Sequence, residues 1–327
     1  MNSMPLIVVL EPSDMEAHKL MQEVGEVRFG PVDKAYTEAQ LIAELSEASA
    51  VVVTSRDKIT RNVISSAPHL KVIAKCGAKP SNVDLDAATE YGVAVTWTPG
   101  SNPTSVAEHA LTLMLALLKH VSITMNRLKQ GEWRTDQLKA SELAEKTVGI
   151  VGLGQSGYRL AQLLGAFNCH ILCYDPYVST ERVDEVGAKQ VDMDTLLRCS
   201  DIVTLHSHMC DETYHMIDEE ELDKMKKSAY IINTGRGPLI NEEALVKALR
   251  ENWIAGAGLD VFEIEPTSKD NPLFSLPNVI VTSHMAGWTH EALRRETQGA
   301  SEEVIRVLRG QNPVNVANPE YISNIRS

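Results

Sequence analysis

Short apolar runs alternate with helical segments along the first third of the chain, which predicts strands and helices in turn. Helical segments with acids and alanines at helical spacing occupy residues such as 37–45 and 84–90. The apolar runs that we predict to be strands are 6–10, 51–53, 72–74 and 93–95. This part of the chain is therefore expected to form a small α/β layer of its own.

A second series of apolar runs begins at Thr147 and predicts another sheet. Its expected strands are near 148–152, 170–174, 202–205, 229–233, 255–259 and 279–281. Six strands separated mostly by helical segments are typical of a doubly wound, mostly parallel sheet. A further helix is expected from 289 to about 308, and we expect it to cross back and complete the first domain.

The segment between the two series contains two prolines and a glycine within residues 98–103, which favours a crossing between domains. The pattern Ser105-Val-Ala-Glu108 predicts a capping box that opens a long helix. Because this helix is apolar on most sides, we expect it to be buried between domains or at a subunit contact. The domains predicted in this way are 1–101 with 289–327, and 102–288.

Composition narrows the class of protein. A net charge of −13 argues against a nucleic-acid partner and against an anionic membrane surface. The apolar stretch 111–118 is far too short to span a bilayer, and the run 6–10 has the character of a first strand. The cysteines form no C-x-x-C pair, so we expect reduced, mostly buried thiols in a cytoplasmic protein; they are Cys76, Cys169, Cys173, Cys199 and Cys210.

The stretch from Thr147 to Asp175 combines a strand, a glycine turn, a helix, a second strand and an acid. Gly152 would supply the backbone angles of the turn, Gly154 would let the main chain approach a pyrophosphate, and Gly157 would let the helix pack closely. The free N–H groups at the start of the helix would face the anion; the residues there are Gln155 and Ser156. This context predicts a dinucleotide site.

Asp175 lies near the spacing of about 20 residues that is expected for a carboxylate bound to the adenosine ribose. A carboxylate there would repel a 2′-phosphate, and no arginine stands next to it in the sequence, since Pro176 and Tyr177 follow. The sequence therefore favours NAD over NADP as the cofactor.

Three further motifs each follow an expected strand, at the edge where open α/β sheets place ligands. They are Ile232-Asn-Thr-Gly-Arg-Gly-Pro238, Leu259-Asp-Val-Phe-Glu-Ile-Glu-Pro266 and Val281-Thr-Ser-His-Met-Ala-Gly-Trp288. The fork of Arg236 between two glycines suits a carboxylate. His284 with a carboxylate partner could cycle a proton near neutral pH.

These three motifs, the glycine turn and Thr98-Pro-Gly-Ser-Asn102 follow one another in the order and spacing of one family. On them, nearly the whole chain resembles the D-isomer-specific 2-hydroxyacid dehydrogenase family. The resemblance implies a doubly wound NAD-binding (Rossmann) domain inserted into a smaller flavodoxin-like substrate domain. It also implies that Arg236 binds the keto acid, that His284 transfers the proton and that Glu265 pairs with His284. Glu263 is the alternative partner for the histidine.

The same resemblance implies further cofactor contacts, at Asn102, His206, Thr234 and Asp260. The run from His206 to Cys210, with His215 beyond it, has a spacing that metal ligands also show. The family carries a similar loop over the adenine, so we expect no metal here.

The expected substrate loop departs from the family pattern, because its second glycine is replaced and a Lys-Pro pair intrudes. The residues expected at the substrate are Arg56, Cys76, Gly77, Ala78, Lys79, Arg236 and Trp288. Lys79 is either a second anion-binding group or an ordinary surface lysine, and Trp288 either narrows the pocket or fills the core. If Lys79 and Arg56 both face the substrate, the keto acid carries a second anionic group.

The function expected from these features is NAD-dependent interconversion of a D-2-hydroxy acid and a 2-keto acid by a homodimer, without nucleic acid, membrane or metal. Within the family, the alternatives are a phosphoglycerate dehydrogenase, a glyoxylate or hydroxypyruvate reductase, and a D-lactate type enzyme. Outside enzymes, the alternative is an NAD-sensing interaction protein that resembles the corepressors on this fold.

Overall fold

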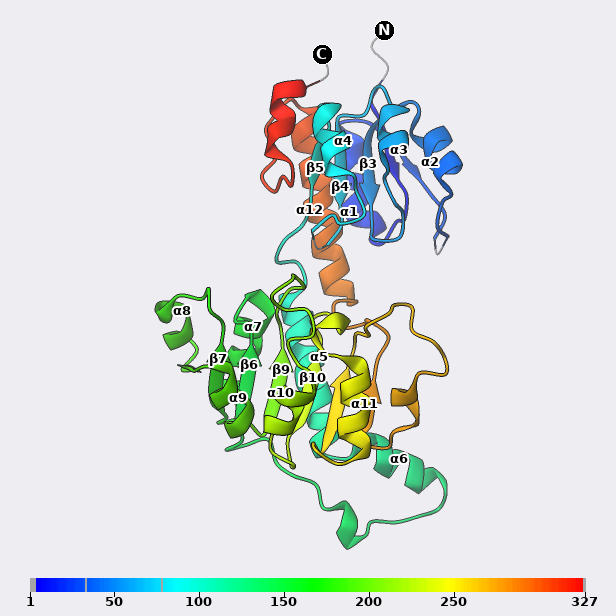
Figure 1. Cartoon of the computed structure of the whole chain (residues 1–327). Helices are drawn as coiled ribbons and strands as arrows, with labels where there is room; N and C mark the ends of the chain where they lie inside the picture. Colours follow the sequence, from blue (N-terminus) through cyan, green and yellow to red (C-terminus); the bar gives the residue numbers. More distant parts are fainter. Residues whose placement is uncertain (1–3, 33, 78, 326–327) are drawn as a thin grey trace. The chain divides into compact units, whose positions relative to one another are not determined.

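The computed structural model describes residues 4–32, 34–77 and 79–325, and it divides into two compact units (Figure 1). The first unit comprises Met1–Asn102 and Thr289–Ser327, and the second comprises Pro103–Trp288. Each unit contains one parallel sheet with helices packed against it. The expectation of two mostly parallel α/β sheets is confirmed.

The sheet of the first unit has five strands in the order β2-β1-β3-β4-β5, which is the order of flavodoxin-like folds. The strands are β1 (Leu6–Val9), β2 (Glu26–Phe29), β3 (Ala48–Val53), β4 (Val72–Lys75) and β5 (Ala94–Thr96). The α-helices are α1 (Met15–Lys19), α2 (Glu38–Leu45), α3 (Arg61–Ser65), α4 (Leu85–Glu90) and α12 (His290–Leu308).

Both faces of this sheet are buried. Along β1, Val8 contributes to one apolar cluster, while Ile7 and Val9 contribute to the other, as the alternation of side chains along a strand requires. Helix α12 adds Ala300 and Val304 to the second cluster. The expected return of the C-terminal helix to the first unit is therefore confirmed.

The sheet of the second unit has seven parallel strands in the order β12-β11-β10-β9-β6-β7-β8, a doubly wound arrangement. The strands are β6 (Thr147–Val151), β7 (His170–Tyr174), β8 (Lys189–Gln190), β9 (Ile202–Leu205), β10 (Tyr230–Asn233), β11 (Gly256–Leu259) and β12 (Val279–Val281). The α-helices are α5 (Pro103–Leu118), α6 (Val121–Lys129), α7 (Gln155–Gly165), α8 (Thr180–Asp184), α9 (Met193–Cys199), α10 (Glu219–Lys224) and α11 (Glu242–Arg250).

Helix α5 differs from its prediction in where it begins. It begins at Pro103, and Ser105 lies buried inside it, so the predicted capping box is wrong. Proline is favoured in the first turn because that turn needs no N–H donor, and this preference outweighs the serine motif. The helix also packs on the sheet of its own unit, because a Cβ on Gly258 of β11 would lie 3.1 Å from Leu113 Cβ.

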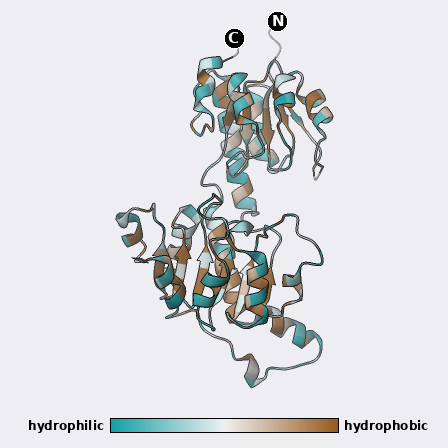
Figure 2. Ribbon diagram, viewed as in Figure 1, coloured by the Kyte–Doolittle hydropathy of each residue, from teal (hydrophilic) through white to brown (hydrophobic). Residues whose placement is uncertain are grey.

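Hydropathy follows the same layers: apolar residues concentrate in the strands and on the inner faces of the helices (Figure 2). Helix α6 is the exception, since none of its residues is buried. Within the described ranges, no single helix is long and apolar enough to cross a membrane, although α5 and α6, bent by 56°, pass that test as a pair on length and composition.

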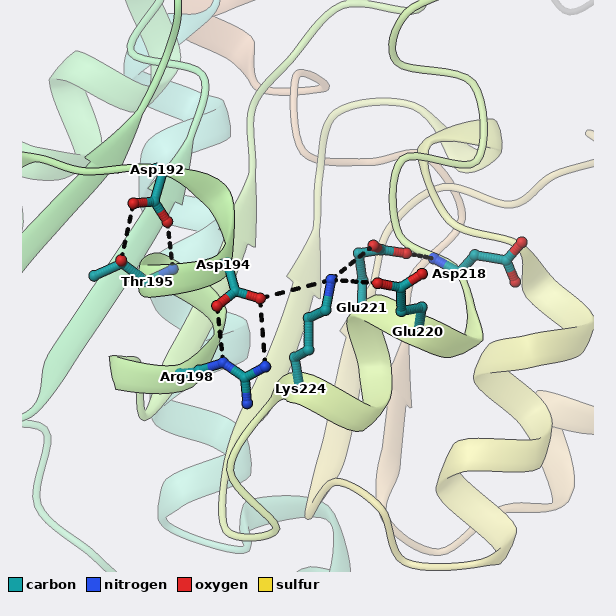
Figure 3. A network of polar contacts seen from close by, with 8 residues as sticks. All are labelled: Asp192, Asp194, Thr195, Arg198, Asp218, Glu220, Glu221 and Lys224. Atoms are coloured by element: carbon teal, nitrogen blue, oxygen red, sulfur yellow. Dashed lines mark hydrogen bonds and ion pairs between the residues drawn. The ribbon is translucent and has the colours of Figure 1, made fainter.

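A network of polar contacts joins helices α9 and α10 of the second unit (Figure 3). Asp192 caps α9 by accepting the Thr195 N–H at 2.7 Å. Lys224 of α10 then bridges to Asp194 of α9 at 3.6 Å, and Asp194 also binds Arg198 at 2.8 Å. Because ion pairs between exposed side chains contribute little to stability, this network orients α9 and α10 more than it stabilises them.

The thiols are all free, but only Cys76 and Cys173 are buried. Cys169 and Cys210 are half-buried and Cys199 is exposed. The expectation of mostly buried thiols is therefore wrong, because a short helix such as α9 turns its final residue, Cys199, away from the core.

Candidate active site

The glycine turn joins β6 to α7 in the second unit. Gly152 has a φ of 92°, and a Cβ there would lie within 3.0 Å of the backbone at residues 206 and 207. A Cβ on Gly157 would lie 2.2 Å from the Gly152 carbonyl oxygen, so only glycine fits there. A Cβ on Gly154 would meet nothing within 4 Å. The turn angles and the close packing expected of Gly152 and Gly157 are confirmed, and the open side of Gly154 suits the approach of a pyrophosphate.

The N-terminus of α7 offers free amides beside this opening. The first hydrogen bond within the helix runs from the Tyr158 N–H to the Gly154 carbonyl at 2.9 Å. The preceding N–H groups, on the exposed Gln155 and the half-buried Ser156, therefore precede the helical ladder and can donate to an anion.

Asp175 stands at the end of β7, half-buried, and ties the turn together. Its Oδ2 accepts the Leu153 N–H at 2.8 Å, and its Oδ1 accepts the Tyr177 N–H at 2.9 Å. These bonds hold the carboxylate at the strand end where an adenosine ribose is expected.

Arg182 is a residue of this region that the sequence analysis missed. Its Nε donates to the Leu153 carbonyl at 3.1 Å, one of its terminal nitrogens donates to the Gly154 carbonyl at 3.3 Å, and the guanidinium stacks over the Tyr158 ring at 4.2 Å. A cation therefore does lie at the turn, although none adjoins Asp175 in sequence.

Two predicted cofactor residues present buried polar atoms without a protein partner in the described part of the chain: Thr234 Oγ1 and His206 Nδ1. His206 Nε2 lies 3.0 Å from Thr204 Oγ1, and burial lowers the pKa of His206 to about 4, so the ring is neutral. Both orphaned atoms fit a ligand that supplies hydrogen bonds, as a bound dinucleotide would.

His284 and Glu265 form the central pair of the second unit. His284 Nδ1 lies 2.7 Å from Glu265 Oε2, and Glu265 Oε1 accepts the Phe262 N–H at 3.0 Å. The hydrogen bond that His284 donates to Glu265 raises the pKa of His284 against the opposing effects of burial and of Arg236. Burial alone would raise the pKa of Glu265, but the bonds from His284 and Phe262 lower it. The pair therefore favours an imidazolium next to a carboxylate.

The alternative partner, Glu263, is engaged elsewhere. Its Oε1 lies 2.8 Å from His215 Nε2, and its Oε2 accepts the Glu242 N–H at 3.1 Å. Among the described residues, no group of three or more histidine, cysteine or acidic side chains is placed to hold a metal ion.

Arg236 is exposed at the end of β10, and its terminal Nη1 donates to the Gly235 carbonyl at 2.7 Å. Asn233 holds this loop by donating to the Arg236 carbonyl at 2.9 Å and accepting the Gly235 N–H at 3.1 Å. The guanidinium influences the pKa of both His284 and Glu265, which places its charge near their pair.

Asp260 is fully buried and fixes the backbone around His284. The His284 N–H donates to the Asp260 carbonyl at 2.7 Å, and the carboxylate accepts the N–H groups of Met285 at 2.7 Å and Ala286 at 2.8 Å. Thr282 donates to the same carboxylate at 2.5 Å. Asp260, predicted as a cofactor residue, therefore also anchors the loop of His284.

His109 extends this network from α5. Its Nε2 lies 2.9 Å from Thr282 Oγ1 and 3.5 Å from Asp260 Oδ1. This contact could not be predicted from the sequence, because His109 is far from the motif of His284 in the chain. Trp288, at the other end of that motif, is 55% exposed, so it does not fill the core.

In the first unit, Arg56 and the loop after β4 are held by contacts within the unit. Arg56 pairs with Glu11 at 2.7 Å. The Cys76 N–H donates to the Val53 carbonyl at 2.9 Å, and the Gly77 N–H donates to Thr98 Oγ1 at 2.7 Å. These two amides are thus occupied within the protein, which opposes the expectation that they bind substrate.

Of the other residues expected at the substrate, Lys79 is exposed and Ala78 lies outside the described residues. Asn102, which follows β5, is half-buried just before Pro103. Burial, with the carboxylate of Glu296 nearby, raises the pKa of the Cys76 thiol to about 12, so this thiol stays protonated.

The chain is similar to a known protein family and to several of its members. Residues 111–286 match the model of the D-isomer specific 2-hydroxyacid dehydrogenase NAD binding domain. The chain is 41% identical over 313 residues to a D-3-phosphoglycerate dehydrogenase of Methanocaldococcus jannaschii, which covers 95% of this chain and 59% of the relative. The chain thus spans about three fifths of the length of that relative.

Other relatives match over nearly their full length. The glyoxylate reductase of Thermococcus litoralis is 36% identical, with 94% of both chains covered. The apo structure of D-lactate dehydrogenase from Escherichia coli superimposes with a TM-score of 0.84 at 31% identity and covers 96% of this chain and 100% of that one. This chain therefore belongs to the D-isomer specific 2-hydroxyacid dehydrogenase family.

Proposed function

We propose that this protein interconverts a D-2-hydroxy acid and a 2-keto acid with NAD. The main support for the proposal is the 2.7 Å contact between His284 Nδ1 and Glu265 Oε2 of this chain, which belongs to the 2-hydroxyacid dehydrogenase family. This contact orients one ring nitrogen and leaves Nε2 to exchange a proton with substrate.

The residues of the second unit account for the proton and the charge in this reaction. Bound NADH supplies the hydride that reaches C2 of the keto acid. The imidazolium of His284 donates the proton that the carbonyl oxygen needs as negative charge grows there, and Glu265 stabilises that imidazolium. Arg236 binds the carboxylate and polarises the carbonyl. The products are the 2-hydroxy acid, NAD and a neutral histidine.

NAD would be held by the glycine turn and by the orphaned atoms near it. The amides of Gln155 and Ser156 would bind the pyrophosphate, and Asp175 would bind the ribose. Thr234 and Asp260, at the ends of β10 and β11, would lie at the nicotinamide. The free side of Gly154 and the unpartnered Thr234 Oγ1 support this assignment.

Consumption of NADH with a panel of 2-keto acids tests the proposal. Glyoxylate, pyruvate, hydroxypyruvate and 3-phosphohydroxypyruvate cover the substrates suggested by the names of the relatives. We expect turnover with at least one of them, and its loss in His284→Ala while NADH still binds. Tight NADH binding without turnover of any keto acid would instead favour an NAD-sensing protein.

We also propose that the protein is a homodimer formed through the second unit. Support comes from α6 and the segment after it, where apolar side chains are exposed: Val121, Met125, Leu128 and Trp133. Such a cluster is typical of a protein contact. Light scattering after size-exclusion chromatography should give twice the chain mass, and Met125→Glu with Leu128→Glu should give a monomer.

The proposed location is the cytoplasm. All five cysteines are free, as is usual where thiols are kept reduced. Fractionation of cells tests this proposal, because activity in a secreted or membrane fraction would contradict it.

A further inference from the structure

His215 and Glu263 form a second histidine–carboxylate pair in the second unit. His215 Nε2 lies 2.8 Å from Glu263 Oε1, and the two side chains are 22% and 29% exposed. Because an ionised carboxylate only accepts hydrogen bonds, Nε2 carries the proton of this bond. The pair therefore ties the segment before α10 to the loop after β11.

Glu263 is also joined to the start of α11. Its Oε2 accepts the Glu242 N–H, and Glu242 Oε2 accepts the Glu263 N–H, both at 3.1 Å. Glu242 Oε1 accepts a bond from Asn271 Nδ2 at 2.7 Å, and the same Nδ2 donates to Thr267 Oγ1 at 3.0 Å. Each carboxylate oxygen of the two glutamates thus accepts a hydrogen bond. The bonds reach residues 263 and 267, so they hold the loop of Glu265 on both of its flanks.

The loop of Arg236 packs directly against this held loop. A Cβ on Gly237 would lie 1.7 Å from the Phe262 carbonyl oxygen, so only glycine permits the contact. The His215 N–H donates to the Pro238 carbonyl at 2.8 Å. His215 therefore binds both loops, the loop of Arg236 through its backbone amide and the loop of Glu265 through its ring.

A short path leads from this ring to the proton-transferring histidine. Phe262, next to Glu263 in the chain, donates its N–H to Glu265 Oε1 at 3.0 Å. The other oxygen, Glu265 Oε2, lies 2.7 Å from His284 Nδ1. A shift of the backbone at residues 262 and 263 would therefore move the carboxylate that orients His284. Catalysis is sensitive to such shifts, since a displacement of about 1 Å can cost a large factor in rate.

We propose that His215 is a positioning residue: through Glu263, its ring holds the loop that carries Glu265 where Glu265 pairs with His284. The inference rests on the proposed function, since it concerns the proton transfer of that reaction. It also assigns a role to the histidine whose spacing from His206 is shared by metal ligands.

Two substitutions of His215 separate its hydrogen bond from its bulk. His215→Phe keeps a ring to stack on Tyr214, where the ring centroids are 3.9 Å apart, and removes the Nε2 donor. His215→Gln loses the ring and keeps an N–H donor at the end of the side chain. In both variants the backbone bond to Pro238 remains, so the loop of Arg236 stays tied.

We expect kcat for reduction of the best keto acid to fall about tenfold in His215→Phe, because Glu265 is misplaced. The KM for the keto acid should stay the same, since Arg236 keeps its place. His215→Gln should regain most of the loss in kcat. Thermal unfolding and NADH affinity show whether each variant is folded.

The pH profile adds a readout that a contribution to stability alone would not move. The hydrogen bond to Glu265 and the charge of Asp260 raise the pKa of His284, whereas burial and Arg236 lower it. In His215→Phe the fall of kcat/KM with rising pH should therefore move to lower pH, and His215→Gln should restore it. In a protein that already carries Glu265→Gln, His215→Phe should move the profile no further.

The control is His170→Phe, which breaks another histidine–carboxylate pair of the second unit. His170 Nε2 lies 3.7 Å from Glu145 Oε2, and both side chains are exposed. His170 begins β7, at the edge of the parallel sheet opposite to the loops of Arg236 and Glu265. Its substitution should leave kcat, KM and the pH profile unchanged.

The outcomes separate this inference from the function on which it rests. Wild-type kcat and pH profile in His215→Phe, or equal losses in His215→Phe and His215→Gln, would overturn the role of His215 and leave the oxidoreductase intact. Absence of turnover with every keto acid in the wild type would remove the proposed function. NMR titration of His284 with carbon-13 labelled histidine then decides for His215, because an equal pKa of His284 in wild type and His215→Phe would overturn its role as well.

Discussion

The protonation of His284 depends on neighbours that act in opposite directions. The hydrogen bond to Glu265 raises its pKa, whereas burial and Arg236 lower it. Because reduction of a keto acid consumes the proton of the imidazolium, the balance between these neighbours sets the pH range of the reaction.

The pH profile of Glu265→Gln tests this balance. In the wild type, kcat/KM for reduction should be constant at low pH and fall as pH rises through the raised pKa of His284. The substitution removes the group that raises this pKa and leaves burial and Arg236, so the fall should move to lower pH. Steady-state rates across the pH range measure it, and an unshifted profile would refute the role of Glu265.

Asp175 is expected to favour NADH over NADPH. Its carboxylate accepts two backbone N–H groups at the turn, and it would repel a 2′-phosphate. Asp175→Ala should therefore narrow the preference for NADH over NADPH, with Arg182 at the turn available to the added phosphate. Dissociation constants from fluorescence titration measure this gap. A wild type that binds NADPH as tightly as NADH would contradict the assignment.

Several of these residues could be predicted from sequence, because they lie within short motifs directly after strands. Arg236, Glu265 and His284 were found in this way. Arg182 and His109 were not, because each comes from a helix remote in sequence from the group that it contacts, and only the packing of the elements shows the contact.

At the scale of elements, the loop that carries His284 depends on the network of Asp260, Thr282 and His109. Thr282 is its central member, since its hydroxyl donates to Asp260 at 2.5 Å and lies 2.9 Å from His109 Nε2. The network links α5 to the end of β12 and so fixes where His284 stands.

Thr282→Val removes that hydroxyl and keeps the size of the side chain. It leaves a buried carboxylate with one donor fewer, so we expect a loss of about 1 to 3 kcal/mol in the free energy of unfolding, together with a lower kcat. Urea denaturation and kinetics measure the two effects. Thr112→Val, on the exposed side of α5, is the control and should change neither. A variant with normal stability and kcat would show that the network does not position His284.

Strong apolar periodicity predicted the central strands well, whereas weak elements escaped it. Strand β2 alternates exposed and half-buried residues at a sheet edge, and β8 has only two residues, both exposed. Edge strands bury little apolar surface, so their sequences carry little pattern. The start of α5 was also predicted wrongly, because the serine motif at Ser105 and the proline at Pro103 indicate different first residues.

At the scale of the whole molecule, the first unit is built from two segments that are distant in the chain. Asn318 joins them: its Oδ1 accepts the Val95 N–H at 2.8 Å, and its Nδ2 donates to the Val93 carbonyl at 3.0 Å and to Thr89 Oγ1 at 3.1 Å. Residues near the C-terminus thereby complete the sheet that the N-terminal segment begins.

Asn318→Ala should destabilise the first unit in particular. Asn318 is buried, so the substitution leaves backbone groups of β5 and the residues before it unsatisfied, at a cost of about 1 to 3 kcal/mol each. Limited proteolysis should cut the first unit faster, while NADH binding to the second unit is retained. Equal protease resistance of variant and wild type would contradict this role of Asn318.

The central claim is that this protein passes a hydride to C2 of a 2-keto acid with His284 as the proton donor. Transfer of deuterium from C4-labelled NADH tests it most directly. The account predicts one deuterium at C2 of a D-2-hydroxy acid, detected by mass spectrometry and chiral chromatography, and a rate about 10²- to 10⁴-fold lower in His284→Ala. NADH binding without label transfer to any keto acid, or undiminished transfer in the variant, would contradict the account.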